Sequence, residues 1–345
     1  MKQLSIKDIA KLAGVVPSTV SFVINGKEKE MRISDELAAK IRKIIAETGY
    51  VPNRSAASLR TGKTHVIGLI VEDISNVFFS LLAKAVEDIA YKDGYRVVYC
   101  STENEDKKGV ELIRVLHKQV DGFIVTPSIG MRDEILKLKK IKKPVVLLDR
   151  YFPDANIPYV LVDNKKAIAQ GVDLLISREY KNIAFVVTAL DQVQMQERLE
   201  AFRQCIKKHT GRMPKYVLKL PFSTMENAYE KGIKSFLEQH PEIDAIFFAT
   251  NYLTIDGLRA LQALKWKIPD RVGVLSFDDH AIFKLYMPSI TAINQPIVDI
   301  ARKGIELLIA QMNNQADHNN SKVLLEAELI CRDSLRKPSK KTKLS

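Results

Sequence analysis

From His65 onward, short apolar segments alternate with amphipathic helical patterns, and this alternation narrows the possible folds more than any other feature. Such alternation predicts parallel sheets with helices packed on both faces. Nine strands in a chain of this length fit two sheets in two lobes better than one open sheet. The predicted strands are Val66–Val71, Arg96–Ser101, Gly122–Thr126, Val145–Leu148, Val160–Val162, Ile183–Thr188, Val217–Leu220, Ala245–Ala249 and Val272–Phe277. The predicted helices include Phe79–Lys92, Lys107–Lys118, Lys165–Ser177, Gln196–Lys208, Met225–Gln239 and Leu253–Leu264.

Polar and aromatic residues lie where several of these strands end. Ligands of parallel α/β sheets bind at the carboxyl ends of the strands. A single Asp after a strand is more often a turn former or a helix cap. Several such residues at the ends of different strands together predict a binding site. These residues are Phe78, Phe79, Asp149, Asn251 and Asp278.

Residues 5–25 predict two short helices joined by a tight turn. Ser5 and Asp8 suit a capping box at the first helix, and Gly14 suits the turn because it can adopt the left-handed conformation. Pro17 fits the first position of the second helix, where a missing N–H costs no hydrogen bond. A helix-turn-helix of this kind places its second helix in the major groove of DNA. The alternative is a generic helical hairpin within a larger domain.

The second helix is expected to have an inward and an outward side. Val20 and Val23 point inward by their helical spacing. The side chains left for an external partner are Ser18, Thr19, Ser21, Phe22 and Asn25.

A third helix and a linker complete the N-terminal part. Ser34 is expected to cap a helix that runs to Thr48 and stops at Gly49. One further short helix, over residues 54–60, is too short to be stable alone, so we expect it to form only when something holds it. The predicted organisation is a helix-turn-helix domain at 1–50, a hinge at 51–63, a two-lobed core at 64–335 and a basic, disordered tail at 336–345.

The net charge of +12 is concentrated at the two ends of the chain. Residues 1–63 hold 12 Lys/Arg against 6 Asp/Glu, and residues 336–345 hold five basic residues and no acid. The long middle part is nearly neutral. A basic surplus that coincides with a helix-turn-helix pattern favours a polyanionic partner, DNA, over simple solubility.

Other function classes find little support. The three cysteines lie far apart, so neither a disulfide framework nor a metal site is expected, and no cofactor is expected. The chain has no nucleotide-binding glycine motif and no nucleophile elbow, which argues against an enzyme. It has no apolar signal core and no membrane-length apolar stretch, so we expect a cytoplasmic protein without a membrane partner.

Several stretches together resemble the lactose-repressor/galactose-repressor (LacI/GalR) family of bacterial transcription regulators. The resemblance covers about residues 4–335, and no single stretch would be specific alone. The resemblance implies an all-α headpiece joined to an α/β core similar to periplasmic sugar-binding proteins, with two doubly wound lobes. The matching stretches are IKDIAKLAGVVPSTVSFVING, GYVPNRSAASLRTGKT, IGLIVEDISNVFF, ERLEAF, FFATNYLTIDGLRAL, VGVLSFDD and PSITAINQP.

The resemblance implies particular contacts for both parts. In the hinge, Leu59 matches the leucine that relatives wedge into the minor groove, where prying open a base step widens the groove; the alternative for Leu59 is burial against the core. Small hinge residues would let two such helices lie close together. The implied DNA-contacting set is Ser5, Lys7, Pro17, Ser18, Thr19, Ser21, Phe22, Asn25, Asn53, Arg54, Ala56, Ala57, Ser58 and Leu59.

In the core, Arg198 matches the arginine that relatives use as an effector ligand, and its planar fork suits vicinal hydroxyls or a carboxylate. Polar groups in a fixed arrangement suit a polyol. Core packing is the alternative for the aromatic members. The implied effector-binding set is Phe78, Phe79, Asp149, Arg198, Phe222, Asn251 and Asp278.

The chain also departs from the family pattern. Val16 replaces the serine that usually caps the second helix, which removes about 1 kcal/mol of capping. Phe22 stands where many relatives have an arginine that reads guanine; it can pack on a thymine methyl but cannot make that contact. Ser58, Tyr252 and Ala201 also differ from the common residues. We therefore expect the operator and the effector to differ from those of better-known members.

The leading hypothesis is a DNA-binding regulator, a repressor of carbohydrate uptake or catabolism genes. It would bind a pseudo-palindromic operator as a homodimer, or as a dimer of dimers, and respond to a sugar or sugar acid between the lobes. The alternatives are a regulator that responds to a non-sugar metabolite such as a purine, and a cytoplasmic sugar-binding protein.

Overall fold

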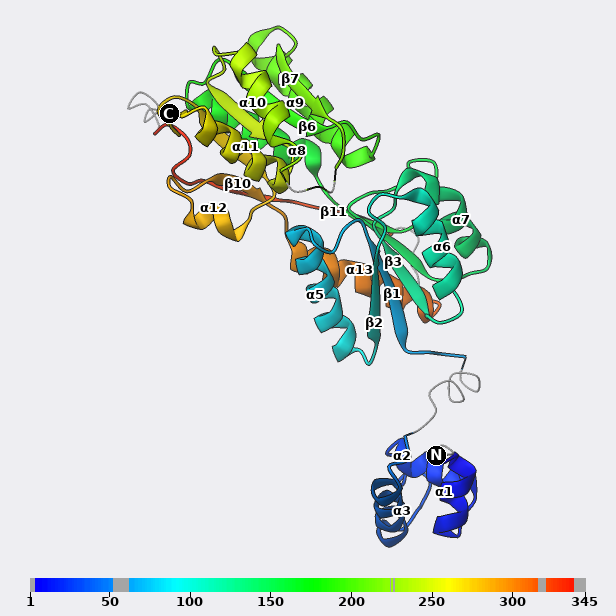
Figure 1. The fold of residues 1–345 in the computed structure, drawn as a ribbon. Helices are drawn as coiled ribbons and strands as arrows, with labels where there is room; N and C mark the ends of the chain where they lie inside the picture. Colours follow the sequence, from blue (N-terminus) through cyan, green and yellow to red (C-terminus); the bar gives the residue numbers. More distant parts are fainter. Residues whose placement is uncertain (1–3, 52–61, 224, 226, 316–320, 338–345) are drawn as a thin grey trace, which may run out of the picture. The chain divides into compact units, whose positions relative to one another are not determined.

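The computed structural model describes residues 4–51, 62–223, 225, 227–315 and 321–337 (Figure 1). Two compact units divide the chain, Met1–Thr64 and His65–Ser345. None of the helices in the described ranges combines the length and the apolar character that a bilayer crossing requires.

The N-terminal unit is a three-helix domain. Its helices are α1 (Ile6–Ala13), α2 (Pro17–Ile24) and α3 (Asp35–Thr48). They enclose a small apolar core of Ile9, Ala10, Ala13, Val20, Val23, Ala38, Ile41 and Tyr50. The inward direction predicted for Val20 and Val23 is thus confirmed.

The ends of these helices follow the predicted signals. The Asp8 carboxylate accepts hydrogen bonds from the Ser5 backbone N–H (2.8 Å) and hydroxyl (2.7 Å). Gly14 has φ 74°, in the left-handed region that closes a helix end. At α3, the Ser34 hydroxyl oxygen accepts from the Leu37 N–H (3.3 Å), and Gly49 has φ 61°. The predicted hinge residues Asn53, Arg54, Ala56, Ala57, Ser58 and Leu59 lie outside the described residues.

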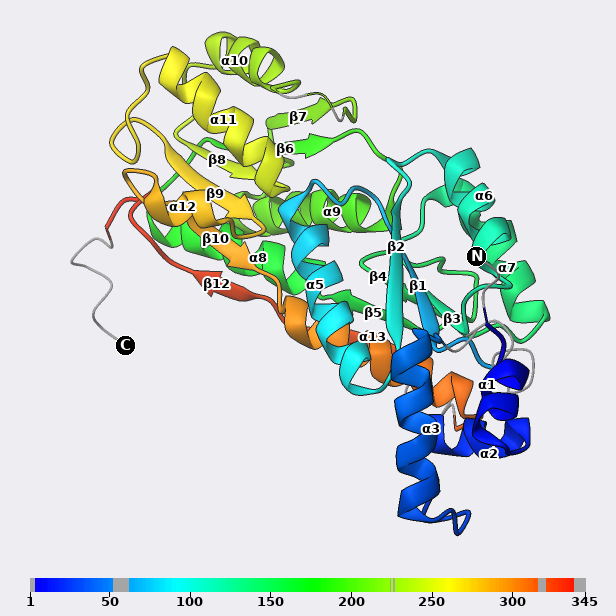
Figure 2. The same ribbon diagram turned by 60° about the horizontal axis from the view of Figure 1, so that its bottom comes forward.

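The second unit contains two six-stranded sheets, each wound with helices on both faces (Figures 1 and 2). The first has the order β11-β5-β4-β3-β1-β2 and the second β12-β10-β9-β8-β6-β7. The first sheet's strands are β1 (Val66–Val71), β2 (Arg96–Ser101), β3 (Gly122–Val125), β4 (Val145–Leu148), β5 (Tyr159–Val162) and β11 (Lys322–Leu325). The second sheet's strands are β6 (Ile183–Thr188), β7 (Tyr216–Leu220), β8 (Ala245–Phe248), β9 (Gly273–Phe277), β10 (Thr291–Asn294) and β12 (Glu328–Ile330).

Helices cover both faces of each sheet, as the alternation predicts. In the first lobe, α5 and α13 pack on one face, and α6 and α7 on the other. In the second lobe, α8 packs on α9, and α10 packs on α11 across the sheet from them (Figure 2). These helices are α5 (Val77–Lys92), α6 (Asp106–Leu116), α7 (Arg132–Lys140), α8 (Asn164–Ser177), α9 (Val193–Thr210), α10 (Glu230–Gln239), α11 (Asn251–Ala263), α12 (Ala281–Leu285) and α13 (Ile297–Met312).

The chain passes between the lobes three times: after β5, after β10, and between β11 and β12. Every pair of neighbouring strands is parallel except β10 and β12, which are antiparallel. The nine-strand prediction is therefore incomplete, because β10, β11 and β12 are missing from it. These strands have only three or four residues, too few for alternation to stand out. Helix α10 also begins at Glu230, five residues later than predicted.

The second lobe depends on aromatic packing at its centre. Phe202 on α9 is fully buried, and its ring stacks on Phe185 of β6 with centroids 4.6 Å apart.

We expect Phe202→Ala to lower the free energy of unfolding by about 3–5 kcal/mol, because it leaves a cavity that the sheet cannot close. Urea denaturation followed by circular dichroism measures this change. Met213→Ala, at a residue that is 56% exposed, is the control and should change stability little; equal losses for both variants would contradict the assignment.

Candidate functional site

Helix α2 presents small polar side chains to solvent. Ser18 and Asn25 are exposed, and Thr19, Ser21 and Phe22 are half-buried at the sides of the helix. The exposed Val16 precedes the helix and makes no side-chain capping bond; its carbonyl accepts from the Thr19 N–H (3.0 Å). Ser5, Lys7 and Pro17 are exposed in the same unit.

Asn25 is held by its own helix. Its side-chain N–H group donates to the Ser21 carbonyl (2.6 Å) and lies 3.4 Å from the Ser21 hydroxyl oxygen. The amide is thereby oriented before any ligand arrives. A pre-oriented side chain loses less conformational entropy on binding.

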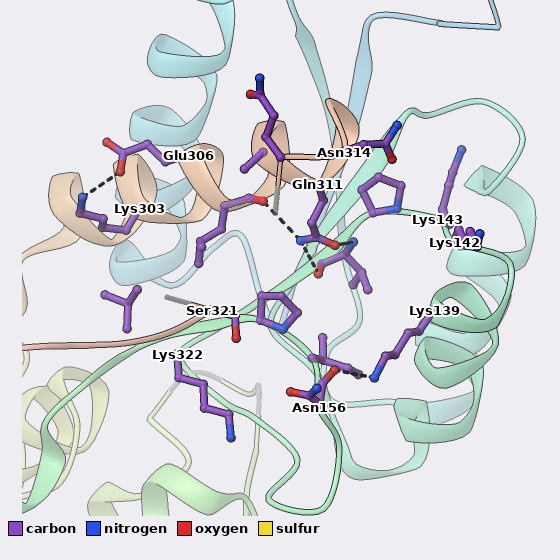
Figure 3. A pocket seen from close by; sticks show the side chains of 18 of the residues that line it. Lys139, Lys142, Lys143, Asn156, Lys303, Glu306, Gln311, Asn314, Ser321 and Lys322 are labelled. Carbon is purple, nitrogen blue, oxygen red and sulfur yellow. Dashed lines mark hydrogen bonds and ion pairs between the residues drawn. The ribbon is translucent and has the colours of Figure 1, made fainter. Parts of the chain in front are cut away.

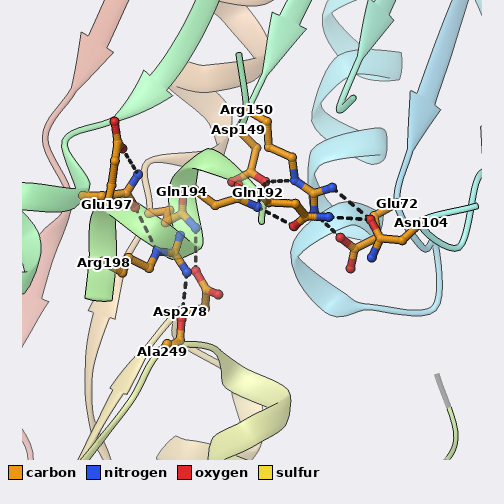
Figure 4. Close-up of polar contacts among 12 residues, drawn as sticks. Glu72, Asn104, Asp149, Arg150, Gln192, Gln194, Glu197, Arg198, Ala249 and Asp278 are labelled. Atoms are coloured by element: carbon orange, nitrogen blue, oxygen red, sulfur yellow. Dashed lines mark hydrogen bonds and ion pairs between the residues drawn. The ribbon is translucent and has the colours of Figure 1, made fainter. Parts of the chain in front are cut away.

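A second site lies between the two lobes, at the carboxyl ends of both parallel sheets (Figure 4). Residues just after β1, β4, β6, β9 and β10 meet there, as the strand-end rule predicts. The cleft is lined by Glu72, Asn76, Phe78, Phe79, Asp149, Arg150, Leu190, Gln192, Gln194, Met195, Arg198, Thr250, Tyr252, Asp278 and Gln295.

Arg150 is the centre of the first-lobe half of this cleft. Its side chain is only 5% exposed and is ion-paired with Glu72, which is 6% exposed. The guanidinium also donates to Asp149 (Nε to Oδ2, 3.3 Å) and to Asn104 (Nη1 to Oδ1, 3.1 Å). Since a buried charge is costly without partners, these acceptors keep Arg150 in one orientation.

Side-chain hydrogen bonds join the lobes across the cleft. Gln192 from the second lobe donates to Asn104 Oδ1 of the first lobe (2.6 Å). Gln194 donates to Asp149 Oδ2 (3.4 Å) and to Gln192 Oε1 (3.1 Å). Figure 4 shows these amides reaching toward the Arg150 cluster. The two lobes are thus held together by side-chain amides that a polar ligand could replace.

Arg198 from α9 is the corresponding cation of the second lobe. It is 2% exposed, and it donates to Asn164 Oδ1 and to the Ala249 carbonyl, both at 2.8 Å. Its guanidinium carbon lies 3.5 Å from the centroid of the Phe277 ring. Burial lowers the pKa of Arg198, and the nearby carboxylates of Asp278 and Asp149 partly offset this by raising it. Arg198 is a fixed planar donor that faces carboxylates of both lobes.

Asp149 and Asp278 occupy equivalent positions in the two lobes. Asp149 follows β4 and has φ 66°, and Asp278 follows β9 and has φ 68°. Burial raises the pKa of both carboxyls above the ordinary 3.8, while Arg150 and Arg198 lower that of Asp149 and Arg198 lowers that of Asp278. Gln295 donates to Asp278 (2.5 Å), so both acids are fixed before a ligand binds.

The cleft is nearly filled by its own side chains. Its volume is about 30 Å³, well below the roughly 300–1,000 Å³ of small-molecule pockets. A small-molecule ligand fits there only if the lobes separate or the Glu72–Arg150 cluster moves. Two polar atoms near the cleft are buried and have no hydrogen-bond partner in the described part of the chain: Asn104 Nδ2 and Gln194 Oε1. Such a ligand could form hydrogen bonds with them.

The structure brings together five of the seven predicted effector residues: Phe78, Phe79, Asp149, Arg198 and Asp278 all line the cleft. Asn251 is buried and contributes through a backbone hydrogen bond to Asp278. Phe222 is not among the residues that line the cleft in the described structure. The rings of Phe78 and Phe79 meet edge to face, with centroids 5.0 Å apart.

Several cleft residues are missing from the sequence prediction. The strand-end rule that selects Asp149 and Asp278 also reaches Glu72, which follows β1. Gln295 follows β10, a strand that the sequence prediction lacks. Arg150 adjoins Asp149 and could have been found in the same way. Gln192 and Gln194 lie in the loop and first turn after β6 and carry no pattern of their own.

Comparison with known proteins gives matches for both units. Residues 5–53 match the family described as bacterial regulatory proteins, lacI family, and residues 172–335 match the periplasmic binding protein-like domain. The chain is 31% identical to the HTH-type transcriptional regulator RegA of Clostridium saccharobutylicum, over 96% of this chain and 98% of that protein. It is 32% identical to the ribose operon repressor of Halalkalibacterium halodurans, over 90% of this chain and 91% of that repressor.

Solved structures show the same fold. The lac repressor dimer bound to operator and the anti-inducer ONPF aligns with a TM-score of 0.86 at 21% identity, covering 97% of this chain and all of that one. The complex of the transcriptional regulator CelR with cellobiose aligns with a TM-score of 0.71 at 24% identity, covering 96% and 99%. The predicted fold, a helical headpiece with two parallel-sheet lobes, is confirmed apart from the antiparallel edge strand β12.

The raised pKa of Asp149 gives a pH-dependent prediction. A carboxyl whose pKa is higher in the folded chain destabilises the fold when it is ionised, so its unfavourable effect is present at neutral pH and disappears as the pH falls toward 3.8. We expect Asp149→Asn to unfold at higher urea concentration than the unchanged protein at pH 7. The difference should shrink between pH 7 and pH 4. A gain that stays constant with pH would contradict this account.

Proposed function

Because the chain belongs to the LacI family of bacterial regulatory proteins, we propose that it represses genes of carbohydrate uptake or breakdown and is controlled by a sugar bound between its lobes. The family consists of DNA-binding transcription regulators and not of enzymes. The observation that carries the proposal is the presence, in one chain, of an exposed α2 surface and a buried polar cleft. Relatives named as repressors of ribose operons support the carbohydrate class.

The headpiece reads DNA through α2. Ser18, Thr19, Ser21, Phe22 and Asn25 form its outward surface, and short polar side chains suit base edges and phosphates. The hinge residues Asn53, Arg54, Ala56, Ala57, Ser58 and Leu59 complete the proposed contact set together with Ser5, Lys7 and Pro17. Leu59 acts as the minor-groove wedge in this proposal.

The protein acts as a homodimer on a pseudo-palindromic operator. Each lobe offers exposed apolar side chains that a partner could cover, since apolar patches on a surface mark interaction sites. On the first lobe these are Leu81, Tyr91, Val98 and Tyr99, from α5 and the edge strand β2. On the second lobe they are Ile282, Leu285 and Met287, in and after α12.

The charge of the cleft favours a neutral sugar over a sugar acid. Glu72, Asp149 and Asp278 outnumber Arg150 and Arg198, so no cation is left over for an anionic ligand. Carboxylates accept hydrogen bonds from sugar hydroxyls, and Arg198 donates to them. Phe78 and Phe79 provide the apolar surface that a sugar ring packs on.

The effector would act by changing the relation of the lobes. A ligand that enters the cleft must displace the amide contacts between Asn104, Asp149, Gln192 and Gln194, so it prefers a lobe arrangement different from the one that they hold. A differential affinity of about 1–3 kcal/mol changes operator occupancy roughly 5- to 150-fold. The change in lobe arrangement thereby couples sugar binding in the cleft to DNA binding by the headpieces.

Arg198→Ala tests the effector site. We expect a neutral sugar from a monosaccharide and disaccharide panel to bind the unchanged protein in calorimetry, and Arg198→Ala to weaken that binding about 100-fold, because a charged donor to the ligand is lost. Operator affinity, measured by fluorescence anisotropy, should stay within about threefold. Arg203→Ala, on the same helix and 36% exposed, is the matched control. If no sugar binds, or if both variants behave alike, the proposal fails.

Phe22→Arg tests the reading helix. A guanidinium at this position can make a bidentate contact with guanine, worth about 1–3 kcal/mol of base discrimination. We expect selection of operators from a randomised pool to change toward guanine at one base pair of each half-site. Leu12→Arg adds the same charge at an exposed position of α1 and should raise general DNA affinity without a new base preference. An unchanged selection by Phe22→Arg would place Phe22 away from the bases.

A further inference from the structure

A large hollow lies on the first lobe, far along the sheet from the cleft between the lobes. Its volume is about 980 Å³. It is bordered by the residues that precede β4 and β5, by the start of β11 and by α13 (Figure 3). Since these strands are parallel, the hollow is at the amino ends of the strands, and the cleft is at their carboxyl ends.

The hollow is strongly basic. Five lysines line it, from three parts of the fold, and Glu306 is the one acid among its lining residues. The α7–β4 region supplies one wall, and α13 and β11 supply the other (Figure 3). The lysines are Lys139, Lys142, Lys143, Lys303 and Lys322.

Little of this positive charge is neutralised by the protein. Among the described residues, Lys303 alone of the five has a carboxylate partner, Glu306 at 2.8 Å. Lys139 donates to the Asn156 carbonyl (2.7 Å), and Lys143 donates to the Val120 carbonyl. A carbonyl accepts a hydrogen bond but carries no full charge, so the wall keeps its attraction for an anion.

The floor of the hollow is fixed. Gln311 of α13 accepts from the Val145 N–H (3.2 Å) and donates to the Val145 carbonyl (3.1 Å), which ties the helix to the start of β4. Pro144 and Pro158 precede the two strands and restrict the backbone there. A preformed concave site of this size suits a small ligand.

The hollow also lies close to the point where the linker joins the core. The backbone N–H of His65 donates to the Asp121 carboxylate (2.8 Å), and Asp121 follows Val120, whose carbonyl binds Lys143. A ligand bound to Lys143 is therefore connected to His65, the first residue of the core, through the adjacent residues Val120 and Asp121.

We propose that this hollow binds a phosphorylated small molecule, as a second ligand site separate from the sugar cleft. Lysine ammonium groups bind phosphate as point charges, and several from different elements can surround a ligand with more than one phosphate. The concave shape favours a small molecule over a DNA duplex, which presents a convex surface. The inference does not depend on the sugar proposal, because the two sites share no residue.

The test uses inorganic pyrophosphate as the probe and the full-length protein in titration calorimetry. We expect saturable binding that Lys142→Gln/Lys303→Gln/Lys322→Gln weakens by at least about tenfold, since each lost ammonium removes a charge-assisted contact. The control is Lys107→Gln/Lys231→Gln/Lys267→Gln, which removes the same charge from exposed positions elsewhere in the core and should leave binding unchanged.

A gain-of-binding variant guards against effects of misfolding. Glu306→Gln removes the acid of the hollow, so pyrophosphate should bind more tightly. Equal binding by all variants, or equal losses in both triple variants, would overturn the proposal. So would a triple variant that leaves pyrophosphate binding unchanged but reduces the salt dependence of operator binding, because the lysines would then contact the DNA backbone.

Discussion

The two-lobed core depends on the buried ion pair between the guanidinium of Arg150 and Glu72. It lies where two sheets present their carboxyl ends to each other, and water is largely excluded. Taking such a cation out of water is unfavourable unless carboxylates and amides surround it. Glu72, Asp149 and Asn104 supply those partners, and Gln192 extends the cluster into the second lobe. In the proposed function, these charged and polar groups select a ligand rich in hydroxyls.

The two lobes solve the same structural problem in the same way. Their strand orders correspond position by position, so β4 corresponds to β9, and an aspartate in the left-handed region follows each. Such a backbone conformation is uncommon outside glycine and is tolerated where surrounding structure holds it. The sharp turn after each strand aims its carboxylate into the space between the sheets. In the proposed function, these matched acids hold the ligand from two sides, with Arg198 between them.

The sequence predicts much of the fold and part of the site. Ile183–Thr188 is buried along its whole length and Val66–Val71 at every residue but the first, so their boundaries follow from apolar runs alone. The short strands β10 to β12 are defined by pairing with distant partners, which no local pattern reveals. Arg150 and Glu72 are 78 positions apart, so their pairing depends on sheet order. Phe222 shows the opposite case, because a family position predicts a contact that the described cleft does not include.

Neither lobe is a continuous piece of chain, because the polypeptide crosses between them three times. The first lobe requires α13 and β11, which come after the whole body of the second lobe. During synthesis on the ribosome, the first sheet must wait with an open edge at β5 until residues 322–325 emerge. A chain cut short after β10 would lack an edge strand in both sheets at once. The C-terminal segment therefore completes both sheets, because it supplies β11 to the first and β12 to the second.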